Sequence, residues 1–286
     1  MAEKLDMKQL LTDLEGMDFK TLNEEELVAL TYELLEHLGD TDSDFRDGLI
    51  YPTLAKIVDS DALPEEQCRH LLGTCLGDRH LFYNLGEKGD SVFMRSFSAL
   101  VVMTLVRRDA KKSFLSEEDY AKVFAKSIEY IEGELDTRGH VEGKGWAHAV
   151  AHGTDMLLAV VRHPIFKTDY FKAVLGALEN CLFKEAGYAD SEDKRFVLVL
   201  KAMQDKGLDD RALEKWINGV FSKLDERFEA EGFSYRYYRA MNNVENFMKS
   251  MYFRFKSDGD RIRLRVMLFD NIKELPYNKA YYFEGS

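Results

Sequence analysis

The chain of 286 residues carries 51 acidic and 39 basic side chains, so its formal net charge is −12 at pH 7. Four prolines and 19 glycines give too few turn signals for a sandwich or barrel of many short strands, and no run of 18 apolar residues is present to span a bilayer. Residues 1–70 hold 18 acidic and 6 basic side chains, which accounts for the whole acidic excess and disfavours nucleic-acid binding by that segment.

The N-terminal segment MAEKLDMKQLLTDLEGM is acidic and amphipathic, unlike a secretion signal with its basic start and apolar centre. The three cysteines, Cys68, Cys75 and Cys181, include no CxxC pair and are typical of buried, reduced thiols. We therefore expect a cytoplasmic protein that does not associate with membranes.

Apolar residues recur at helical spacing along almost the entire chain. Asn23 and Glu26 form a capping-box pattern, Pro52 is expected to kink or divide its helix, and Ser43 and Ser116 are expected N-caps. The second half of residues 90–109 is apolar nearly all round, which predicts a central, buried helix. The expected helices cover residues 3–15, 24–37, 43–60, 64–77, 90–109, 116–135, 146–163, 168–186, 191–206, 209–231, 234–256 and 260–274.

About a dozen helices joined by short loops, with no convincing strand, predict an all-α fold. Helix pairs recur at roughly 40-residue spacing, which favours an α/α superhelix or HEAT-like helical-repeat stack over an irregular all-α globule. No linker marks a boundary, so we expect one domain over residues 1–286, in which residues 201–286 pack as C-terminal helices on the preceding part.

The segment DTRGHVEGKGWAHAVAHGTDMLLAVVRH, residues 136–163, brings together several chemically capable side chains. On a helix counted from His148, the side chains of His148, His152 and Asp155 share one stripe, which would suit a divalent metal with Asp155 as third ligand or orienting group. Ala149 takes the place of the zincin glutamate, so a zinc protease is excluded. A buried hydrogen-bond network and a solvated face remain open as alternatives.

The loop GHVEGKG at 139–145 fails the phosphate-binding P-loop pattern, since it is one residue short and Lys144 precedes glycine. A looser anion site remains open, in which Lys144 and the free amides of a helix beginning at Trp146 attract an anion. Gly153 within a helix predicts a close approach, by another helix or by a ligand.

Other charged residues have structural interpretations. We expect Asp90 to be an N-cap and Asp136 and Arg138 to form an ion pair that braces the loop. Arg95 needs a partner if it is buried, and Asp136 and Asp155 are candidates. Arg46 and Asp47, beside Gly48, raise the same question of a charge that needs a partner if it is buried, and we favour a structural role for them over a role in a site.

The stretches FRDGLIYPTLAKIV, DSVFMRSFSALV and LDTRGHVEGKGWAHAVAHGTDMLL together resemble the uncharacterised bacterial family known as domain of unknown function 2785, over residues 45–200, apart from Thr154 where alanine is usual. The resemblance implies a soluble, all-helical bacterial protein without established activity. It also implies a recurrent set of polar and aromatic positions, compatible with a ligand pocket or a buried network: Arg46, Asp47, Asp90, Arg95, Asp136, Arg138, Trp146, His148, His152 and Asp155.

Residues 233–265 hold eight basic, three acidic and eight aromatic side chains, a combination that can bind polyanions. The favoured alternative places Phe247, Tyr252 and Phe255 in the core and leaves Arg236, Arg239, Lys249 and Lys256 solvated or paired with the acidic N-terminal quarter. Nucleic-acid binding is therefore not expected.

Three functional hypotheses follow from these patterns. The first is a binding or scaffold module whose pocket, between the helix of Arg95 and the helix of His152, takes a peptide, a protein segment or a small anionic ligand. The second is a metal-dependent hydrolase using His148, His152 and Asp155 as ligands, with Arg95 or Arg138 stabilising negative charge. Polyanion binding by residues 233–265 is the third.

Overall fold

The computed structural model describes residues 2–14, 16, 18–257 and 261–279. Within this part, every regular element is helical except one short hairpin, so the predicted all-α fold is confirmed. The chain divides into two compact units, residues 1–166 and 167–286. The expected single domain and helical-repeat arrangement stay predictions. Among the described residues, no helix combines the length and apolarity needed to cross a bilayer.

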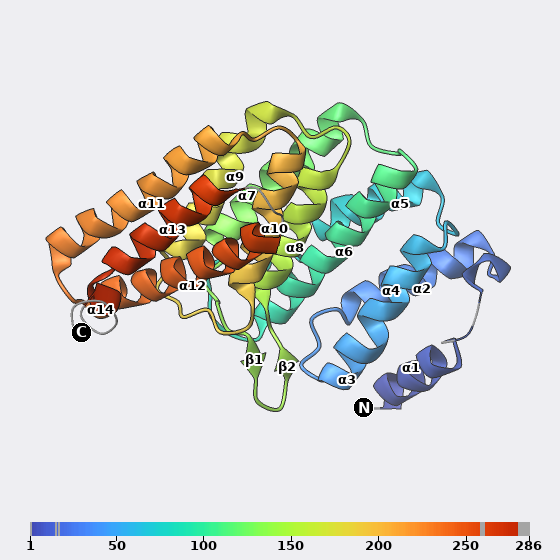
Figure 1. Cartoon of the computed structure of the whole chain (residues 1–286). Helices are drawn as coiled ribbons and strands as arrows, with labels where there is room; N and C mark the ends of the chain where they lie inside the picture. The colour runs from blue at the N-terminus through green and yellow to red at the C-terminus, as the bar shows by residue number, and fades with distance from the viewer. Residues whose placement is uncertain (1, 15, 17, 258–260, 280–286) are drawn as a thin grey trace. The chain divides into compact units, whose positions relative to one another are not determined.

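The first unit is built around the long helix α6. Figure 1 shows α6 with α4 and α5 on one side and α8 on the other, and α7 packs against α8. Most α6 side chains are buried, as its apolar sequence predicts. The elements of this unit are α1 (Ala2–Asp13), η1 (Phe19–Thr21), α2 (Glu24–Glu36), α3 (Ser43–Phe45), η2 (Arg46–Ile50), α4 (Tyr51–Asp59), α5 (Glu65–Cys75), α6 (Ser91–Lys111), α7 (Glu117–Gly133), β1 (His140–Val141), β2 (Gly145–Trp146) and α8 (Ala149–Arg162).

Local signals set most helix starts. Both hydrogen bonds of the capping box between Asn23 and Glu26 are present, and the Ser116 hydroxyl accepts from the third residue of α7. The expected cap at Ser43 is wrong: the carboxylate of Asp42 accepts from the Phe45 amide instead. The helix around Pro52 is divided as expected, because a π-helical turn, η2, separates α3 from α4 and places the proline in the first turn of α4, where its missing N–H costs nothing.

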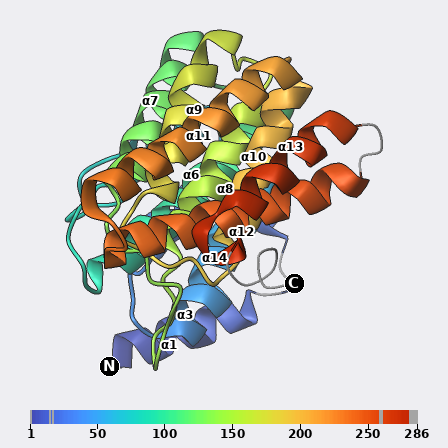
Figure 2. The ribbon, with the colours of Figure 1, turned by 60° about the vertical axis from the view of Figure 1, so that its left-hand side comes forward.

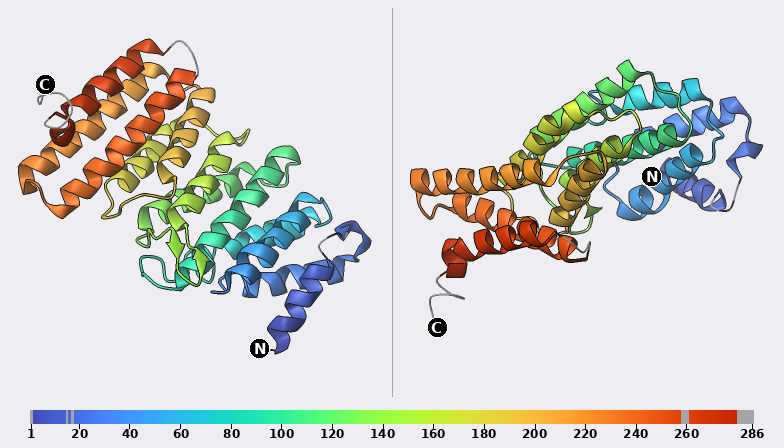
Figure 3. Two further views of the ribbon diagram at one scale, coloured as in Figure 1. Left: turned by 60° about the horizontal axis from the view of Figure 1, so that its bottom comes forward. Right: turned by 45° about the horizontal axis from the view of Figure 1, so that its top comes forward.

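The second unit consists of η3 (Thr168–Tyr170), α9 (Phe171–Leu182), α10 (Glu192–Asp205), α11 (Asp210–Glu231), α12 (Tyr235–Ser257), α13 (Ile262–Glu274) and α14 (Pro276–Asn278). Its centre is α12, which contacts α9, α10, α11 and α13; Figures 2 and 3 show α12 beside α13. The Phe247 ring meets Phe196 and Trp216 edge-on at centroid distances of 6.2 and 6.0 Å.

The basic and aromatic segment 233–265 contributes aromatic side chains to the core of this unit. Phe247 and Phe255 are buried in the core, as the favoured alternative expects, while Tyr252 is half-buried. Arg236 pairs with Glu185 at 2.7 Å and Lys249 with Glu245 at 2.6 Å, so partners of both cations lie within the same unit. The side chain of Lys256 lies outside the described residues.

Candidate functional site

The polar segment before α8 folds as a hairpin, and the expected helix from Trp146 is wrong. His140 pairs with Trp146 and Val141 with Gly145 in an antiparallel ladder. The Ala147 amide donates to the Gly139 carbonyl at 2.8 Å, which extends the pairing. Figure 1 shows this β1–β2 hairpin protruding below α8. Helix α8 therefore starts only at Ala149.

Positive φ angles explain why the chain turns there. Gly143 and Gly145 have φ of +71° and +76°, which glycine adopts without steric cost. A Cβ on Gly145 would also lie 2.5 Å from the Cβ of Ser43. His148 is the N-cap of α8 with φ 49° and ψ 31°, so its side chain does not continue the helical stripe assumed from the sequence.

The looser anion site at this position is also wrong. Lys144 Nζ lies 2.8 and 2.7 Å from the two carboxylate oxygens of Asp90, and Trp146 belongs to a strand, not to a helix start. Asp90 does take the N-cap position of α6, but its side chain accepts from Lys144 and from no amide of the helix. The Lys144–Asp90 pair therefore anchors the hairpin to α6.

Arg46 is fully buried and holds the hairpin from the other side. Its Nη1 donates to the Asp40 carbonyl at 2.6 Å and its Nη2 to the Lys144 carbonyl at 2.8 Å. Its Nε lies 2.7 Å from Asp47 Oδ1, an ion pair whose angle falls short of a hydrogen bond. The guanidinium stacks 4.1 Å from the centre of the Phe93 ring. These contacts support the structural interpretation of Arg46 and Asp47.

Arg95 pairs with Glu134, so both expected partners, Asp136 and Asp155, are wrong. Its Nε and Nη2 donate to the two oxygens of Glu134 at 2.7 and 2.9 Å, and both side chains are fully buried. Burial alone lowers the pKa of Arg95, but the hydrogen bonds and charge of Glu134 outweigh it and raise the pKa. The remaining donors bond the Ser91 hydroxyl and the carbonyls of Tyr83, Asn84 and Glu87.

Asp136 and Arg138 form the ion pair expected from the sequence, with Arg138 Nη2 2.6 Å from Asp136 Oδ2. Arg138 also donates to the Gly89 carbonyl at 2.9 Å, and the Gly89 amide donates back to Asp136 at 3.1 Å. Together with Arg95, this pair fastens residues 83–90 to residues 134–138. Two ion pairs, Arg95–Glu134 and Asp136–Arg138, therefore form a polar network at the N-terminal end of α6.

The Asp136→Asn variant is expected to lose stability at neutral pH but not in acid. Burial by itself raises the pKa of Asp136, yet the side chain of Arg138 and the amides of Gly89 and Arg138 outweigh it, so the pKa lies below its usual value. Because the pKa of Asp136 is lower in the folded than in the unfolded protein, its carboxylate contributes fully to stability above the unfolded pKa of about 3.9. This contribution is lost as the pH falls below that value and the folded protein also becomes protonated at Asp136. Urea unfolding of both proteins at about pH 7 and pH 3 measures this; a pH-independent difference contradicts it.

The aromatic side chains near the start of α8 lie against one another. The His148 ring stacks on Trp146 at a centroid distance of 4.2 Å, and the Trp146 side chain remains 40% exposed. His152 Nδ1 lies 2.8 Å from the Ser96 hydroxyl, which also donates to the Ala147 carbonyl. His152 is therefore part of the network that joins α8 to α6.

The three predicted metal ligands, His148, His152 and Asp155, lie at the N-cap and in the first two turns of α8. The rings of His148 and His152 lie 5.6 Å apart between centroids and nearly perpendicular. Asp155 is one turn beyond His152 and lines a groove between α6 and α8. The metal site formed by these three residues stays a prediction.

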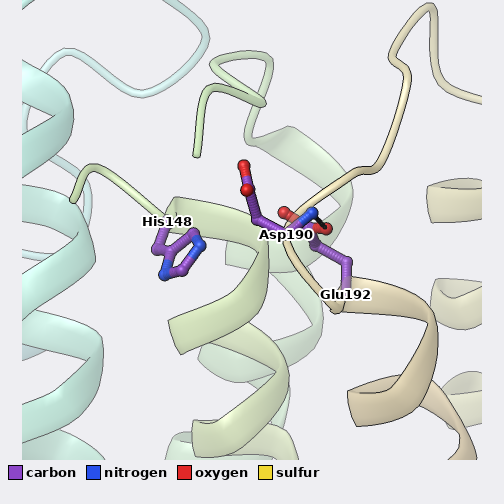
Figure 4. Close-up of side chains that lie close together, drawn as sticks. All are labelled: His148, Asp190 and Glu192. Carbon is purple, nitrogen blue, oxygen red and sulfur yellow. Dashed lines mark hydrogen bonds between the residues drawn. The ribbon is translucent and has the colours of Figure 1, made fainter. Parts of the chain in front are cut away.

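Two carboxylates at the start of α10 had no role predicted from the sequence. Figure 4 draws Asp190 and Glu192, with the Asp190 amide donating to Glu192 Oε2 at 2.9 Å. Burial raises the pKa of Glu192. This hydrogen bond shapes the turn in which Ser191 has φ 71° and from which α10 begins. Figure 4 also draws His148, which belongs to the first unit.

Gly153 allows a helix to approach closely, one of the two alternatives left open. A Cβ on Gly153 would lie 2.7 Å from Cε1 of Tyr130, whose ring from α7 packs over the glycine. The Tyr130 hydroxyl donates to the Ala149 carbonyl at 3.3 Å. The glycine therefore serves the packing of α7 against α8.

The groove of Asp155 contains two cations that were not predicted as site residues, Arg107 and Lys111. It has a volume of about 540 Å³. Arg107 and Lys111 lie one turn apart at the end of α6, and Arg162 is the last residue of α8. The i, i+4 spacing of Arg107 and Lys111 could have predicted from the sequence that both cations share one face of the helix. The lining residues are Met103, Arg107, Ala110, Lys111, Asp155, Leu158, Ala159 and Arg162.

Comparison with known proteins gives one match. Residues 81–253 match the family model described as "Protein of unknown function (DUF2785)". The match begins later and extends further than the resemblance seen at residues 45–200, and so includes much of α12. No curated protein and no solved structure matches the chain. Because the family model covers more than half of the sequence, the chain belongs to the DUF2785 family of proteins of unknown function.

Proposed function

We propose that this protein is a binding module and that the groove between α6 and α8 takes a small anionic ligand with an apolar part. The observation that carries the proposal is the set of three cations, Arg107, Lys111 and Arg162, around one groove of about 540 Å³. A groove of this volume is in the range of small-molecule sites. It lies between the helix of Arg95 and the helix of His152, and of the candidate pocket residues named from the sequence only Asp155 lines it.

The direction of the two helices explains how the cations meet. Ser96 near the start of α6 contacts the start of α8, and the last turns of both helices line the groove, so α6 and α8 run parallel. Each helix end contributes roughly half a negative charge. With the carboxylate of Asp155, about two negative charges face three cations. The groove thus keeps a net charge of about +1, which favours an anion.

The cations are available to a ligand. Among the described residues, no carboxylate lies within 4.0 Å of the charged nitrogens of Arg107, Lys111 or Arg162. All three side chains are exposed. Met103, Leu158 and two alanines form the apolar part of the wall. A carboxylate or phosphate on a short apolar group would satisfy both the charge and the wall.

Calorimetric titration of the full-length protein tests the proposal. The probes are octanoate and phenyl phosphate, with citrate and inorganic phosphate as anions that lack an apolar part. We expect octanoate or phenyl phosphate to bind, and Arg162→Glu to weaken this binding at least about tenfold, since it replaces a charge-assisted contact of about 1.5–3 kcal/mol by repulsion.

The matched control is Lys112→Glu, which makes the same charge change at an exposed residue outside the groove. It should leave the affinity within about twofold of wild type at moderate salt. The proposal fails if none of the four probes binds saturably, or if both variants bind like wild type.

A further inference from the structure

The second unit presents an exposed apolar surface across three helices. A groove of about 370 Å³ lies between α10 and α12, and another of about 280 Å³ lies between α12 and α13. Tyr252 lines one groove and Phe253 the other, and their rings touch edge-on at 5.6 Å, so the two grooves are neighbours on the surface. We call this surface the apolar strip; the buried Val197 lines its floor, and its exposed or half-buried apolar members are Leu198, Tyr252, Phe253, Ile262, Val266 and Phe269.

Most apolar side chains of the strip are exposed to solvent. Phe253 is 65% and Ile262 66% exposed, and Val266 and Phe269 follow on the same face of α13, one and two turns on. Contiguous exposed apolar surface of this kind marks an interaction site more often than a solvated face. The charged residues that line its two grooves are all basic: Lys194, Arg254 and Arg265. A partner for the strip should therefore be apolar and acidic.

Helix α1 in the first unit has that complementary character. Leu5 is 63% and Leu10 44% exposed, and Asp6 and Asp13 are exposed on the same face. At 100° per residue, these four side chains span about 140° of the helix. The outward face of α1 therefore carries both apolar and acidic side chains.

The basic residues of α1 point the other way. Lys4 Nζ lies 2.7 Å from Asp40, and Lys8 Nζ lies 2.7 Å from Asp42. Both lysines also lie over the Phe45 ring, at 5.0 and 5.7 Å from its centre. Their charges are thus used inside the first unit, which leaves the outward face of α1 negative.

We propose that α1 of one copy of this protein docks on the apolar strip of a second copy. The leucines of α1 would enter the two grooves, and its aspartates would face Lys194, Arg254 and Arg265. Because the two surfaces differ, the contact is heterologous, and a pair of copies keeps one free α1 and one free strip for further copies. Grooves that accept protruding side chains favour a helix over the flat surface of a membrane.

Sedimentation velocity of the full-length protein tests the proposal over about 1 µM to 1 mM, the range of weak interfaces. The wild-type sedimentation coefficient should rise with concentration. Two variants each destroy one surface: Leu5→Glu with Leu10→Glu, and Phe253→Glu with Ile262→Glu. All four positions are exposed, so the fold should be kept, which circular dichroism checks. Each variant alone should lose the concentration dependence.

Mixing the two variants gives the sharpest result. An equimolar mixture should form a heterodimer and nothing larger, because one intact α1 and one intact strip remain between the two proteins. The matched control is Leu135→Glu, at an exposed leucine outside both surfaces, which should associate like wild type.

Two outcomes overturn the proposal. One is a wild-type protein that stays monomeric over the whole range, or a mixture that stays monomeric. The other is monomeric protein that co-sediments with vesicles of phosphatidylglycerol and phosphatidylcholine and loses this only in the Phe253→Glu, Ile262→Glu variant, which would assign the strip to an anionic bilayer.

Discussion

Replacement of Glu134 by glutamine should lower the free energy of unfolding by about 3–5 kcal/mol, the cost of leaving one member of a buried ion pair without its partner. The guanidinium of Arg95 is fully buried and both oxygens of Glu134 accept from it. The amide of the variant offers one acceptor and no charge. Urea unfolding at neutral pH, followed by circular dichroism, measures the change.

An exposed ion pair provides the control for Glu134→Gln. Lys122 and Glu118 lie 2.9 Å apart on the surface of α7, and both side chains are mostly exposed. Glu118→Gln should give no measurable change, because solvent screens exposed pairs. A Glu134→Gln variant as stable as wild type would show that Arg95 draws its stabilisation from the carbonyls of Tyr83, Asn84 and Glu87 instead.

The Arg46→Met variant should lose about 3 kcal/mol of unfolding free energy, because two half-buried carbonyls lose their donors at about 1–2 kcal/mol each and the stacked cation is removed. The carbonyls belong to Asp40 and Lys144, and the stacking partner is Phe93. Since Lys144 belongs to the hairpin turn, the hairpin should also loosen. Urea unfolding measures the free energy of unfolding.

Tryptophan fluorescence reports on the hairpin in the same variant. The protein has two tryptophans, so the experiment uses a Trp216→Phe background in which Trp146 is the only emitter. We expect red-shifted emission and faster cleavage by protease between residues 139 and 146. Arg46→Lys should restore little, because one ammonium cannot reach carbonyls on two sides. Unchanged emission together with unchanged stability would contradict the assigned role of Arg46.

Helix positions were predictable because the signals that set them are local. The capping box at Asn23, the cap at Ser116 and the division at Pro52 depend on side chains within four residues of the helix end. The start of α8 was not predictable in the same way. The hairpin before it is held by contacts with Arg46 and Asp90, which lie far away in the sequence.

The partner of Arg95 shows the same limit. A basic side chain in a buried helix needs a counter-charge, because an unpaired buried charge is costly. The sequence offers several carboxylates near residue 135 as partners. Which of them reaches the guanidinium depends on how α7 ends: Glu134, the C-cap residue, pairs with Arg95, whereas the equally buried Asp136 pairs with Arg138.

The sequence by itself determined the all-α class, the helix boundaries set by caps, the burial of α6 and the Asp136–Arg138 pair, because periodicity, capping and neighbouring charges act over a few residues. Only the tertiary structure decided that Glu134 neutralises Arg95, that His148 stands in a left-handed turn outside α8, and that the ends of α6 and α8 gather three cations around one groove. These features depend on how distant helices pack, and packing places side chains together that no local spacing relates.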